Sequence, residues 1–435
     1  MKKFLALLLI LPVVTFCNPE NNEPEGGDNN GTEQNGGNTT DPNDPVYEKA
    51  APEVKDGDVV LATNPNVEKF LTEVTYQDKD YSTTKIYDYY GGFNCKKYND
   101  KGELDPNGKE VTRPVSDKPS SYSIRWKPDT DAGDITVHLA DKLDWSTDIK
   151  VTAGKAYVDI TNLVPNDEYT FKATATNGKV MAEGKFTTTG HMHQVTFKSD
   201  CRNGRDLGGW KTESGKTVRY RRLYRTGRWD SANLSKQGRA DILAEGFGGQ
   251  LDLRGSSDVL SSTTVNGLEF CAPGIEQGGT AMLKDVAADG ENKTKKCFDF
   301  ALQQIRKGKG VAFHCSLGRD RTGTLAILFL GLLGVPEHDI AKEYECTYFA
   351  PMGYSVSSSE EAGWDDKHPD LVQQGLHFPY FLNTRCAWVY TDVVPYFWQL
   401  AGNGSFASGV EKYLKEVAKV PQADIDEFRN LMLVD

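Results

Sequence analysis

The chain has 435 residues, enough for two or three domains, and a formal net charge of −12 at pH 7. An acidic chain of ordinary globular composition is a poor candidate for general nucleic-acid binding, so we expect no nucleic-acid partner. Any site for an anionic ligand must then be a local basic pocket.

The N-terminal stretch "MKKFLALLLILPVVTFC" resembles a bacterial lipoprotein signal over residues 1–17. Two lysines precede an apolar run that ends at Phe16, shorter than the roughly 20 residues of a membrane-spanning helix. The resemblance implies export and lipid modification of Cys17, which would anchor the protein to a membrane in the periplasm or at the cell surface. Phe16 departs from the small residue usual before the cysteine. The alternative is an ordinary secretory signal with an incidental cysteine.

Two segments without a predicted function follow. Residues 18–46 are rich in Asn, Gly, Glu and Asp with almost no apolar side chains, which predicts a disordered tether. Residues 47–112 are left without a domain assignment, although "NPNVEKFLTEVTY" predicts a short helix with Asn66 as its cap. An anchor followed by a tether is the arrangement expected of a soluble module held away from a membrane.

Residues 113–190 alternate apolar and polar side chains in short stretches, namely "SYSIRW", "DITVHLA", "KAYVDI", "EYTFKATA" and "AEGKFTTT". Turn residues separate these stretches, a pattern typical of an all-β sandwich. Leu163, Pro165 and Tyr169 form an LxPxxxY arrangement that resembles fibronectin type III domains. The resemblance implies a β-sandwich in which Tyr169 hydrogen-bonds back to the chain and Trp126 lies in the core. Such modules serve as spacers or as protein- and glycan-binding domains.

Residues 191–435 alternate predicted strands with predicted helices. "GGQLDLRG" and "GKGVAFHC" each predict a buried strand that leads into a polar loop. Helices are predicted for "CFDFALQQIRKG", for "GTLAILFLGLLGV" and for the last stretch from "FASGVEKYLKEVAKV" to "DIDEFRNLML". This alternation favours an α/β domain with a central, mainly parallel sheet flanked by helices. Functional loops in such folds follow the carboxyl ends of strands, as "HCSLGRDRTG" does here.

That loop has the composition of a phosphate-binding site. A strand that ends at His314 and a helix that begins near Thr322 would present backbone N–H groups and a positive helix end to an anion. Gly318 permits a conformation that a side chain would hinder. Arg321 can make a bidentate contact with two phosphate oxygens. The predicted phosphate-binding residues are Ser316, Leu317, Gly318, Arg319, Asp320 and Arg321.

Cys315 lies within this predicted loop. Positive surroundings favour the thiolate, so the pKa of Cys315 is expected to be below that of a free cysteine, and the thiolate is a nucleophile. The expected chemistry is attack on phosphorus, a phosphocysteine intermediate and hydrolysis by water, with the loop amides and Arg321 stabilising the transferred charge. Asp320 is the candidate general acid, and its rivals are Asp285 and Asp289 in "MLKDVAADGENK".

Neighbouring residues are expected to support the loop. His314 would do so through hydrogen bonds, and Thr322 through a hydroxyl near the sulfur. Asp252 and Arg254 would line or brace the pocket. A further set is interpreted as a structural ion-pair network, namely Arg205, Asp206 and Arg225. The mechanism needs no metal or cofactor, and the eight cysteines show no zinc spacing.

The loop matches CX5R and is close to the longer form HCxxGKDRTG, and in this it resembles a bacterial tyrosine phosphatase family with dual or broad specificity. "NGRDLGGWKTESGKTVRYRRLYRTGRWDSA", "QLDLRG" and "GVEKYLKEVAKVPQADIDEFRNLML" extend the resemblance over most of residues 195–435. It implies Cys315 as nucleophile, Arg321 as phosphate clamp and Asp320 as general acid. The implied partners are phosphorylated proteins, phosphoinositides or other phosphomonoesters.

Two departures from the family pattern bear on substrate choice. The lysine of the family's loop is Arg319 here, which keeps a charge for a second anionic group but changes its geometry. The acidic residue usual after DLR appears as Asp258, and its role is left open. Two alternatives to a protein phosphatase also stay open. One is an inositol-phosphate or phosphoinositide phosphatase, and the other is a non-catalytic surface protein that captures phosphorylated ligands.

Overall fold

The computed structural model describes residues 57–73, 118–197, 203–229, 235–255, 265–350 and 392–435. The signal and tether predicted for residues 1–46, including Cys17, lie outside this part of the chain, and so does Asp258. Within the described ranges, no helix is both long enough and apolar enough to cross a membrane.

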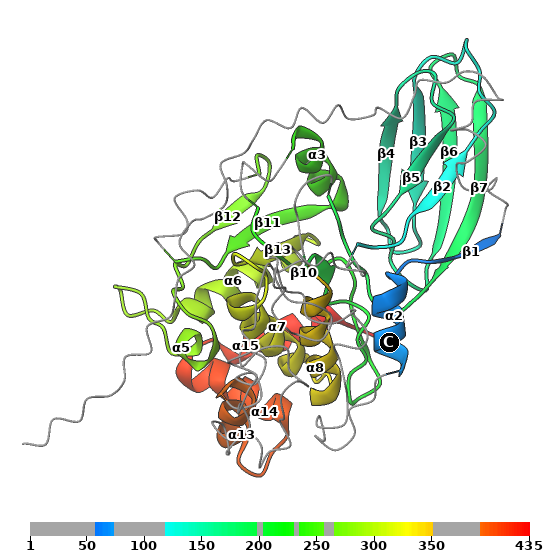
Figure 1. Cartoon of the computed structure of the whole chain (residues 1–435). Coiled ribbons are helices and arrows are strands. Elements are labelled where there is room, and N and C mark those ends of the chain that lie inside the picture. The colour runs from blue at the N-terminus through cyan, green and yellow to red at the C-terminus, as the bar shows by residue number, and fades with distance from the viewer. Residues whose placement is uncertain (1–56, 74–117, 198–202, 230–234, 256–264, 351–391) are drawn as a thin grey trace, which may run out of the picture. The chain divides into compact units, whose positions relative to one another are not determined.

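Two β-sheets are built from the strands between residues 58 and 189 (Figure 1). The strands are β1 Asp58–Leu61, β2 Tyr122–Arg125, β3 Ile135–Ala140, β4 Ser146–Val151, β5 Tyr157–Ile160, β6 Glu168–Ala175 and β7 Val180–Thr189. The larger sheet has the order β1-β7-β6-β3-β4, and the smaller sheet pairs β2 with β5. β1 runs parallel to β7, and the other pairings are antiparallel. β4 is a strand that the sequence patterns did not predict.

The two aromatic residues predicted to be structural are buried in this region. The Tyr169 hydroxyl accepts a hydrogen bond from the backbone N–H of Val164 at 2.9 Å, which is the predicted bond back to the chain. The Tyr169 ring stacks on Phe186 with 5.2 Å between ring centroids. The indole N–H of Trp126 donates to the carbonyl of Lys155 at 3.0 Å. Both side chains therefore belong to the core and its hydrogen bonds.

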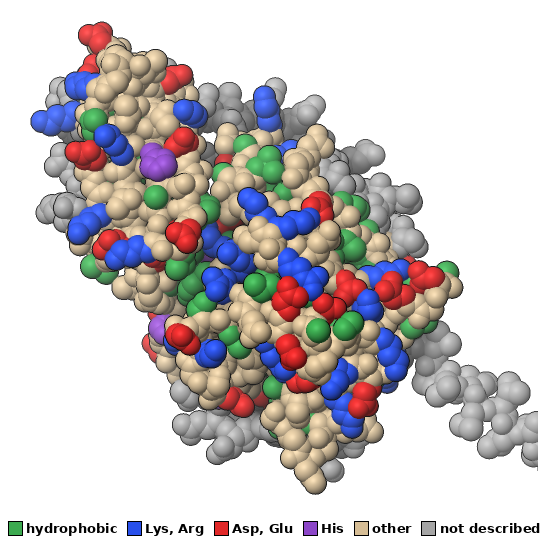
Figure 2. Space-filling view, turned by 180° about the vertical axis from the view of Figure 1, so that it is seen from behind, with side chains coloured by type: hydrophobic (Ala, Val, Ile, Leu, Met, Phe, Trp, Pro, Cys, Tyr) green, Lys and Arg blue, Asp and Glu red, His purple; other side chains and the backbone are tan. Residues whose placement is uncertain are grey.

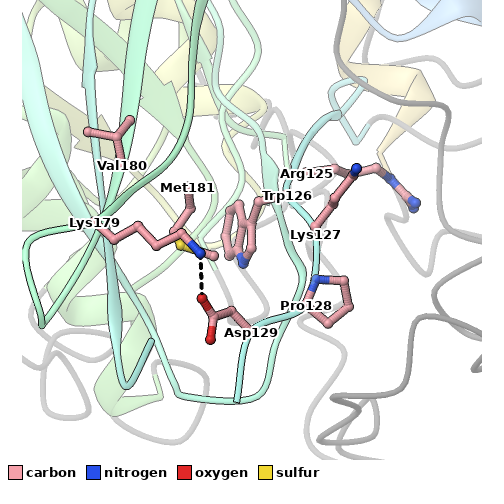
Figure 3. A pocket seen from close by; sticks show the side chains of 8 residues that line it. All are labelled: Arg125, Trp126, Lys127, Pro128, Asp129, Lys179, Val180 and Met181. Atoms are coloured by element: carbon pink, nitrogen blue, oxygen red, sulfur yellow. Dashed lines mark hydrogen bonds and ion pairs between the residues drawn. The ribbon is translucent and has the colours of Figure 1, made fainter. Parts of the chain in front are cut away.

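A cavity of about 530 Å³ lies beside Trp126 and is lined by residues 125–129 and 179–181 (Figure 3). The ammonium of Lys179 and the carboxylate of Asp129 form an ion pair at 2.7 Å in this lining. The lining residues come from the β-sheet region and include none of the loop residues predicted to carry chemistry.

Part of the segment left unassigned between residues 47 and 112 is ordered into the structure. β1 extends the larger sheet, and helix α2 (Pro65–Glu73) follows it. The buried side chains of α2 join the core that also contains the helices of the C-terminal half; they are Val67, Phe70 and Leu71. Residues 58–73 thus contribute to both halves of the described chain.

The N-terminal cap of α2 corrects a prediction. The side-chain oxygen of Asn64 accepts the backbone N–H of Asn66 at 2.9 Å, so Asn64 is the cap and Asn66 is not. Pro65 takes the first helical position, where its missing N–H costs nothing, and the cap therefore lies two residues earlier than predicted.

A five-stranded sheet lies at the centre of the C-terminal half (Figure 1). Its strands are β8 Arg205–Asp206, β10 Leu223–Thr226, β11 Phe247–Asp252, β12 Glu269–Cys271 and β13 Gly310–His314. The order is β12-β11-β13-β10-β8, and only β8 is antiparallel to its neighbour. A separate short pair joins β9 (Thr217–Val218) to β14 (Leu433–Val434). β13 is inserted between β10 and β11, so the loop that follows it is flanked by the carboxyl ends of two other strands.

Helices cover both faces of this sheet. They are α3 Lys236–Glu245, α5 Gly279–Leu283, α6 Lys293–Arg306, α7 Asp320–Leu333, α8 Glu337–Glu345, α13 Val394–Ala401, α14 Phe406–Lys412 and α15 Gln422–Met432, with a 3-10 turn at Cys346–Phe349 and a π turn at Tyr413–Val417. Val311 and Phe313 of β13 pack in the core that contains α6 and α7, whereas Ala312 packs in the cluster that contains Ile242 of α3. The helices predicted from periodicity are confirmed, except that α7 begins at Asp320 rather than near Thr322.

Candidate active site

Residues 315–319 connect the central strand β13 to the N-terminus of α7, where the predicted chemistry is placed. Gly318 has φ +69°, a left-handed conformation that disfavours any side chain. A Cβ atom on Gly318 would also lie 2.4 Å from the carbonyl oxygen of Thr226. The prediction that this turn requires glycine is therefore supported by backbone conformation and by close packing.

The carbonyl groups of residues 316–318 are hydrogen-bonded to donors outside the loop. The first accepts the backbone N–H of Arg228 at 3.1 Å. The carbonyls of Leu317 and Gly318 accept hydrogen bonds from the side-chain amide of Asn203 at 3.2 and 2.9 Å. The carbonyl of Gly318 also accepts a hydrogen bond from the Arg225 guanidinium at 2.7 Å. Each of the three consecutive peptide groups therefore has its oxygen bound away from the loop's interior.

This binding fixes where the loop amides point. In a planar trans peptide, the N–H of one residue points opposite to the C=O of the residue before it. The N–H groups of residues 317–319 are accordingly directed away from the donors that hold the carbonyls. Successive N–H groups on one side of a turn, next to a positive helix end, form a nest that suits a dianion such as a phosphate group.

Cys315 is the first residue of the loop, directly after β13, and its side chain is buried. Burial alone would raise the pKa of the thiol, and the Asp320 carboxylate adds to that effect. The positive charge of Arg321 and the polar groups of the nearby Thr322 oppose the effect of burial, and the pKa of Cys315 lies below its usual value. The surroundings of Cys315 thus favour the thiolate more than burial alone would.

Arg321 lies in the first turn of α7 beside this cysteine. Its guanidinium donates to the backbone carbonyl of Ile275 at 3.0 Å, which anchors the side chain next to the loop. A guanidinium has five N–H donors in a rigid plane, so one anchoring bond is compatible with a two-point contact to phosphate oxygens.

Arg319 and Asp320 form an ion pair with each other. The Arg319 Nε lies 3.0 Å from one carboxylate oxygen of Asp320, and a second contact is 3.4 Å long. The Arg319 side chain is fully buried, whereas the Asp320 side chain is 26% exposed. Arg319 thus packs inside the molecule, which contradicts the expectation that its charge would face a second anionic group. Asp320 is the member of the pair that is partly exposed.

The rival aspartates lie elsewhere and have other partners. Asp285 pairs with the ammonium of Lys293 at 3.0 Å. Asp289 is exposed and pairs with Lys296 at 3.3 Å. The backbone N–H of Glu291 and the side chain of Lys296 hold the pKa of Asp289 below its usual range. Of the three aspartates, Asp320 is the one whose charge acts on the Cys315 thiol.

His314, Asp252 and Arg254 hold the base of the loop. The amide of Gln250 donates to His314 Nε2 at 3.1 Å, and its oxygen is occupied by a backbone N–H, so the proton of the imidazole sits on Nδ1. That Nδ1 faces the carbonyl of Cys315 at 3.4 Å. The guanidinium of Arg254 donates hydrogen bonds to the two carboxylate oxygens of Asp252 at 3.0 and 2.8 Å. The contact between Gln250 and His314 connects β11 and β13 next to the loop.

A buried network includes two of the three upstream residues predicted to form ion pairs. Arg205 and Arg225 both pair with Glu343, at 2.7 and 2.6 Å. Asp206 belongs to a neighbouring cluster, in which it contacts His193 at 3.1 Å. Glu343 was not predicted, because nothing in the sequence of the helix "EHDIAKEYE" shows which of its glutamates faces water and which faces the core.

Three arginines near the loop are buried, namely Arg225, Arg254 and Arg319. On the face drawn in Figure 2, acidic and basic side chains of the described residues are interspersed. The described residues also contain no group of three or more His, Cys, Asp or Glu side chains placed to hold a metal ion.

Comparison with known proteins agrees with this geometry. A family model described as "Tyrosine phosphatase family" matches residues 198–434, which include β8 to β14 and α3 to α15. The chain belongs to this family. A protein of Cupriavidus necator named "Putative tyrosine-protein phosphatase" is 30% identical over 173 residues. A "Tyrosine-protein phosphatase" of Nostoc commune is 33% identical over 122 residues.

These similarities cover only parts of the proteins compared. The match to the Cupriavidus necator protein takes in 35% of this chain and 62% of that protein. The match to the Nostoc commune protein takes in 27% of this chain and 37% of that protein. The family membership is thus established for the C-terminal half, where the loop lies.

Proposed function

We propose that this protein is a phosphomonoester hydrolase of the tyrosine and dual-specificity phosphatase class, acting through a phosphocysteine intermediate. The observation that carries the proposal is the position of Cys315. Its thiol has a pKa lowered by Arg321, and it begins a loop whose carbonyls at Leu317 and Gly318 are bound by Asn203 and Arg225. A buried cysteine without that role would normally have a raised pKa, as Cys346 does, at about 12.

The proposed reaction has two displacements at phosphorus. The Cys315 thiolate attacks the phosphorus, the S–P bond forms, the P–O bond of the ester breaks, and Asp320 gives its proton to the departing oxygen. A water molecule then attacks the phosphocysteine, the S–P bond breaks, and the Asp320 carboxylate takes the proton from that water. The loop amides and Arg321 stabilise the charge on the three phosphoryl oxygens in both steps.

Asp320→Asn is expected to separate substrates by leaving group. Turnover of alkyl phosphates should fall by about 10²–10⁴-fold, since a poor leaving group needs the proton, whereas p-nitrophenyl phosphate should be affected much less. Asp285→Asn and Asp289→Asn serve as matched controls and should resemble wild type on both substrates. Steady-state kinetics on the two ester types measure this. Wild-type behaviour of Asp320→Asn on alkyl phosphates would remove Asp320 from the mechanism.

Gly318→Ala is expected to disable the loop, because the new methyl group meets the Thr226 carbonyl and φ is positive. We expect kcat/KM on p-nitrophenyl phosphate to fall by about 10²–10³-fold, the loss typical of one misplaced anion donor. Gly334→Ala is the matched control, with φ +81° and nothing within 4 Å of the added carbon. Thermal unfolding should shift for both variants, but activity should fall only for Gly318→Ala. Equal activities would contradict the nest.

The substrate class follows from a direct comparison of turnover. Phosphotyrosine peptides and phosphoinositides, assayed without added metal, distinguish a protein phosphatase from a phosphoinositide phosphatase. Phosphate binding by the wild type without hydrolysis of any phosphomonoester would instead indicate a capture protein.

We also propose that the protein is an exported lipoprotein anchored through Cys17, with a fibronectin type III-like module before the catalytic domain. The lysines and short apolar run of residues 1–17 support the first part. The two sheets and the Tyr169 bond to Val164 support the second. Labelling of cells with radioactive palmitate tests the anchor. The label should be lost in Cys17→Ala.

A further inference from the structure

We propose that Glu343 is a positioning residue for the reaction, which keeps the loop amides directed at the phosphoryl group through two buried arginines. Glu343 lies on α8, and the hydrogen bonds of its side chain within the described residues go to Arg205 and Arg225. The inference rests on the proposed function, because it assigns Glu343 a part in the same site.

The first step is a shared carboxylate. One oxygen of Glu343 accepts Nε of Arg205 at 2.7 Å, and the other accepts Nη1 of Arg225 at 2.6 Å. The backbone carbonyl of Glu343 accepts a further N–H of Arg205 at 2.8 Å. All three side chains are nearly or fully buried. The two guanidinium groups share this carboxylate, which is their common counter-ion, and both also donate to the hydroxyl of Thr347, at 3.0 and 3.3 Å.

The second step runs from the arginines to the loop. Arg225 uses its other terminal nitrogen to bind the carbonyl of Gly318 at 2.7 Å. Arg205 donates to the side-chain oxygen of Asn203 in a short hydrogen bond, which leaves the Asn203 NH₂ facing the loop carbonyls. Glu343 thus fixes both donors that capture the Gly318 carbonyl.

The third step concerns charge. Burial, together with the nearby charge of Arg205, lowers the pKa of Arg225 to about 10, and the carboxylate of Glu343 acts in the opposite direction. The charged form of Arg225 is therefore disfavoured by its surroundings, and Glu343 is the group that offsets this. Removing the carboxylate would leave two like charges buried without their counter-ion, a change that strongly destabilises the arrangement around them. The arginines should then separate, and the Gly318 carbonyl should lose its donors.

The consequence for the site follows from the geometry of the peptide bond. A freed Gly318 carbonyl can rotate toward the nest, and the N–H of the next residue then points out of it. The nest would lose a donor for the phosphoryl group and a stabilising dipole near the thiolate. Both phosphate affinity and the pKa of Cys315 should respond.

The test compares Glu343→Gln with Glu245→Gln in the full chain. Glu245 is a matched control, because its carboxylate is also buried and also pairs with an arginine, Arg221 at 2.7 Å, away from the loop. For Glu343→Gln we expect the inhibition constant of inorganic phosphate to rise at least about 10-fold, which corresponds to the loss of one hydrogen bond to a charged group. Alkylation of Cys315 by iodoacetamide should require higher pH. The control should keep both values even where its thermal stability falls.

Asn203→Asp provides a second variant, which leaves the Glu343 carboxylate in place between the two arginines. It keeps an oxygen for Arg205 but replaces the NH₂ donor with an oxygen that repels the loop carbonyls. It should raise the phosphate inhibition constant and shift the alkylation profile in the same direction as Glu343→Gln.

The outcomes separate this inference from the proposed function. A wild type that hydrolyses phosphomonoesters, with phosphate affinity and alkylation profile unchanged in Glu343→Gln and Asn203→Asp, would overturn the positioning role alone. Equal shifts in Glu343→Gln and Glu245→Gln would also overturn it, because they would report general destabilisation. A wild type without hydrolysis would overturn the proposed function instead, and phosphate binding would still test the loop geometry.

Discussion

Cys315→Ser is expected to abolish turnover, with kcat on p-nitrophenyl phosphate reduced by at least about 10⁴-fold, since a serine hydroxyl at this position has no comparable fraction of anion at neutral pH. The loop and Arg321 are unchanged in this variant, so inorganic phosphate should still bind. The measurement is steady-state kinetics together with a phosphate-binding titration. Cys297→Ser is the control, because Cys297 is also buried but burial raises its pKa well above the usual value. Residual activity near wild type in Cys315→Ser would exclude the cysteine mechanism.

Arg321→Met should be nearly as damaging. The variant loses the two-point contact to the phosphoryl group, and kcat/KM should fall by about 10³–10⁵-fold, the effect typical of an arginine that stabilises a transferring phosphoryl group. It also loses the charge that offsets burial of Cys315. The pKa of the thiol should therefore rise, and alkylation by iodoacetamide should reach its plateau at higher pH than in wild type.

Arg321→Lys separates the two roles of this arginine. Lysine keeps a positive charge near the sulfur, so the alkylation profile should stay close to that of wild type. It cannot make the planar two-point contact, so kcat/KM should still fall by about 10²–10³-fold. If Arg321→Met left the alkylation profile unchanged, the account of the lowered thiol pKa would be wrong.

The loop itself could be predicted from sequence because its chemistry is local. The predicted nest depends on three features that lie within about ten residues of each other: the end of a strand, a glycine and the beginning of a helix. Cys315, Gly318 and Arg321 have fixed spacings within this short segment. The strand β13 and the helices α6 and α7 were also predictable, since hydrophobic periodicity is a local property of the chain.

The support of the loop could not be predicted in the same way. Glu343 and Asn203 contact the loop only after the chain has folded, and nothing in their own neighbourhood distinguishes a buried glutamate from an exposed one. The burial of Arg319 could not be predicted from its position in the sequence either. Its position in the motif suggested a charge facing a ligand, whereas packing buries it and pairs it with Asp320.

Detection of the covalent intermediate tests the central claim most directly. Wild-type protein and Asp320→Asn would be mixed with p-nitrophenyl phosphate, quenched in acid within milliseconds, digested and analysed by mass spectrometry. The account predicts one phosphoryl group on the peptide that contains Cys315, and none in Cys315→Ser. Phosphate release by the wild type without any phosphorylated Cys315 peptide, together with activity retained in Cys315→Ser, would contradict it.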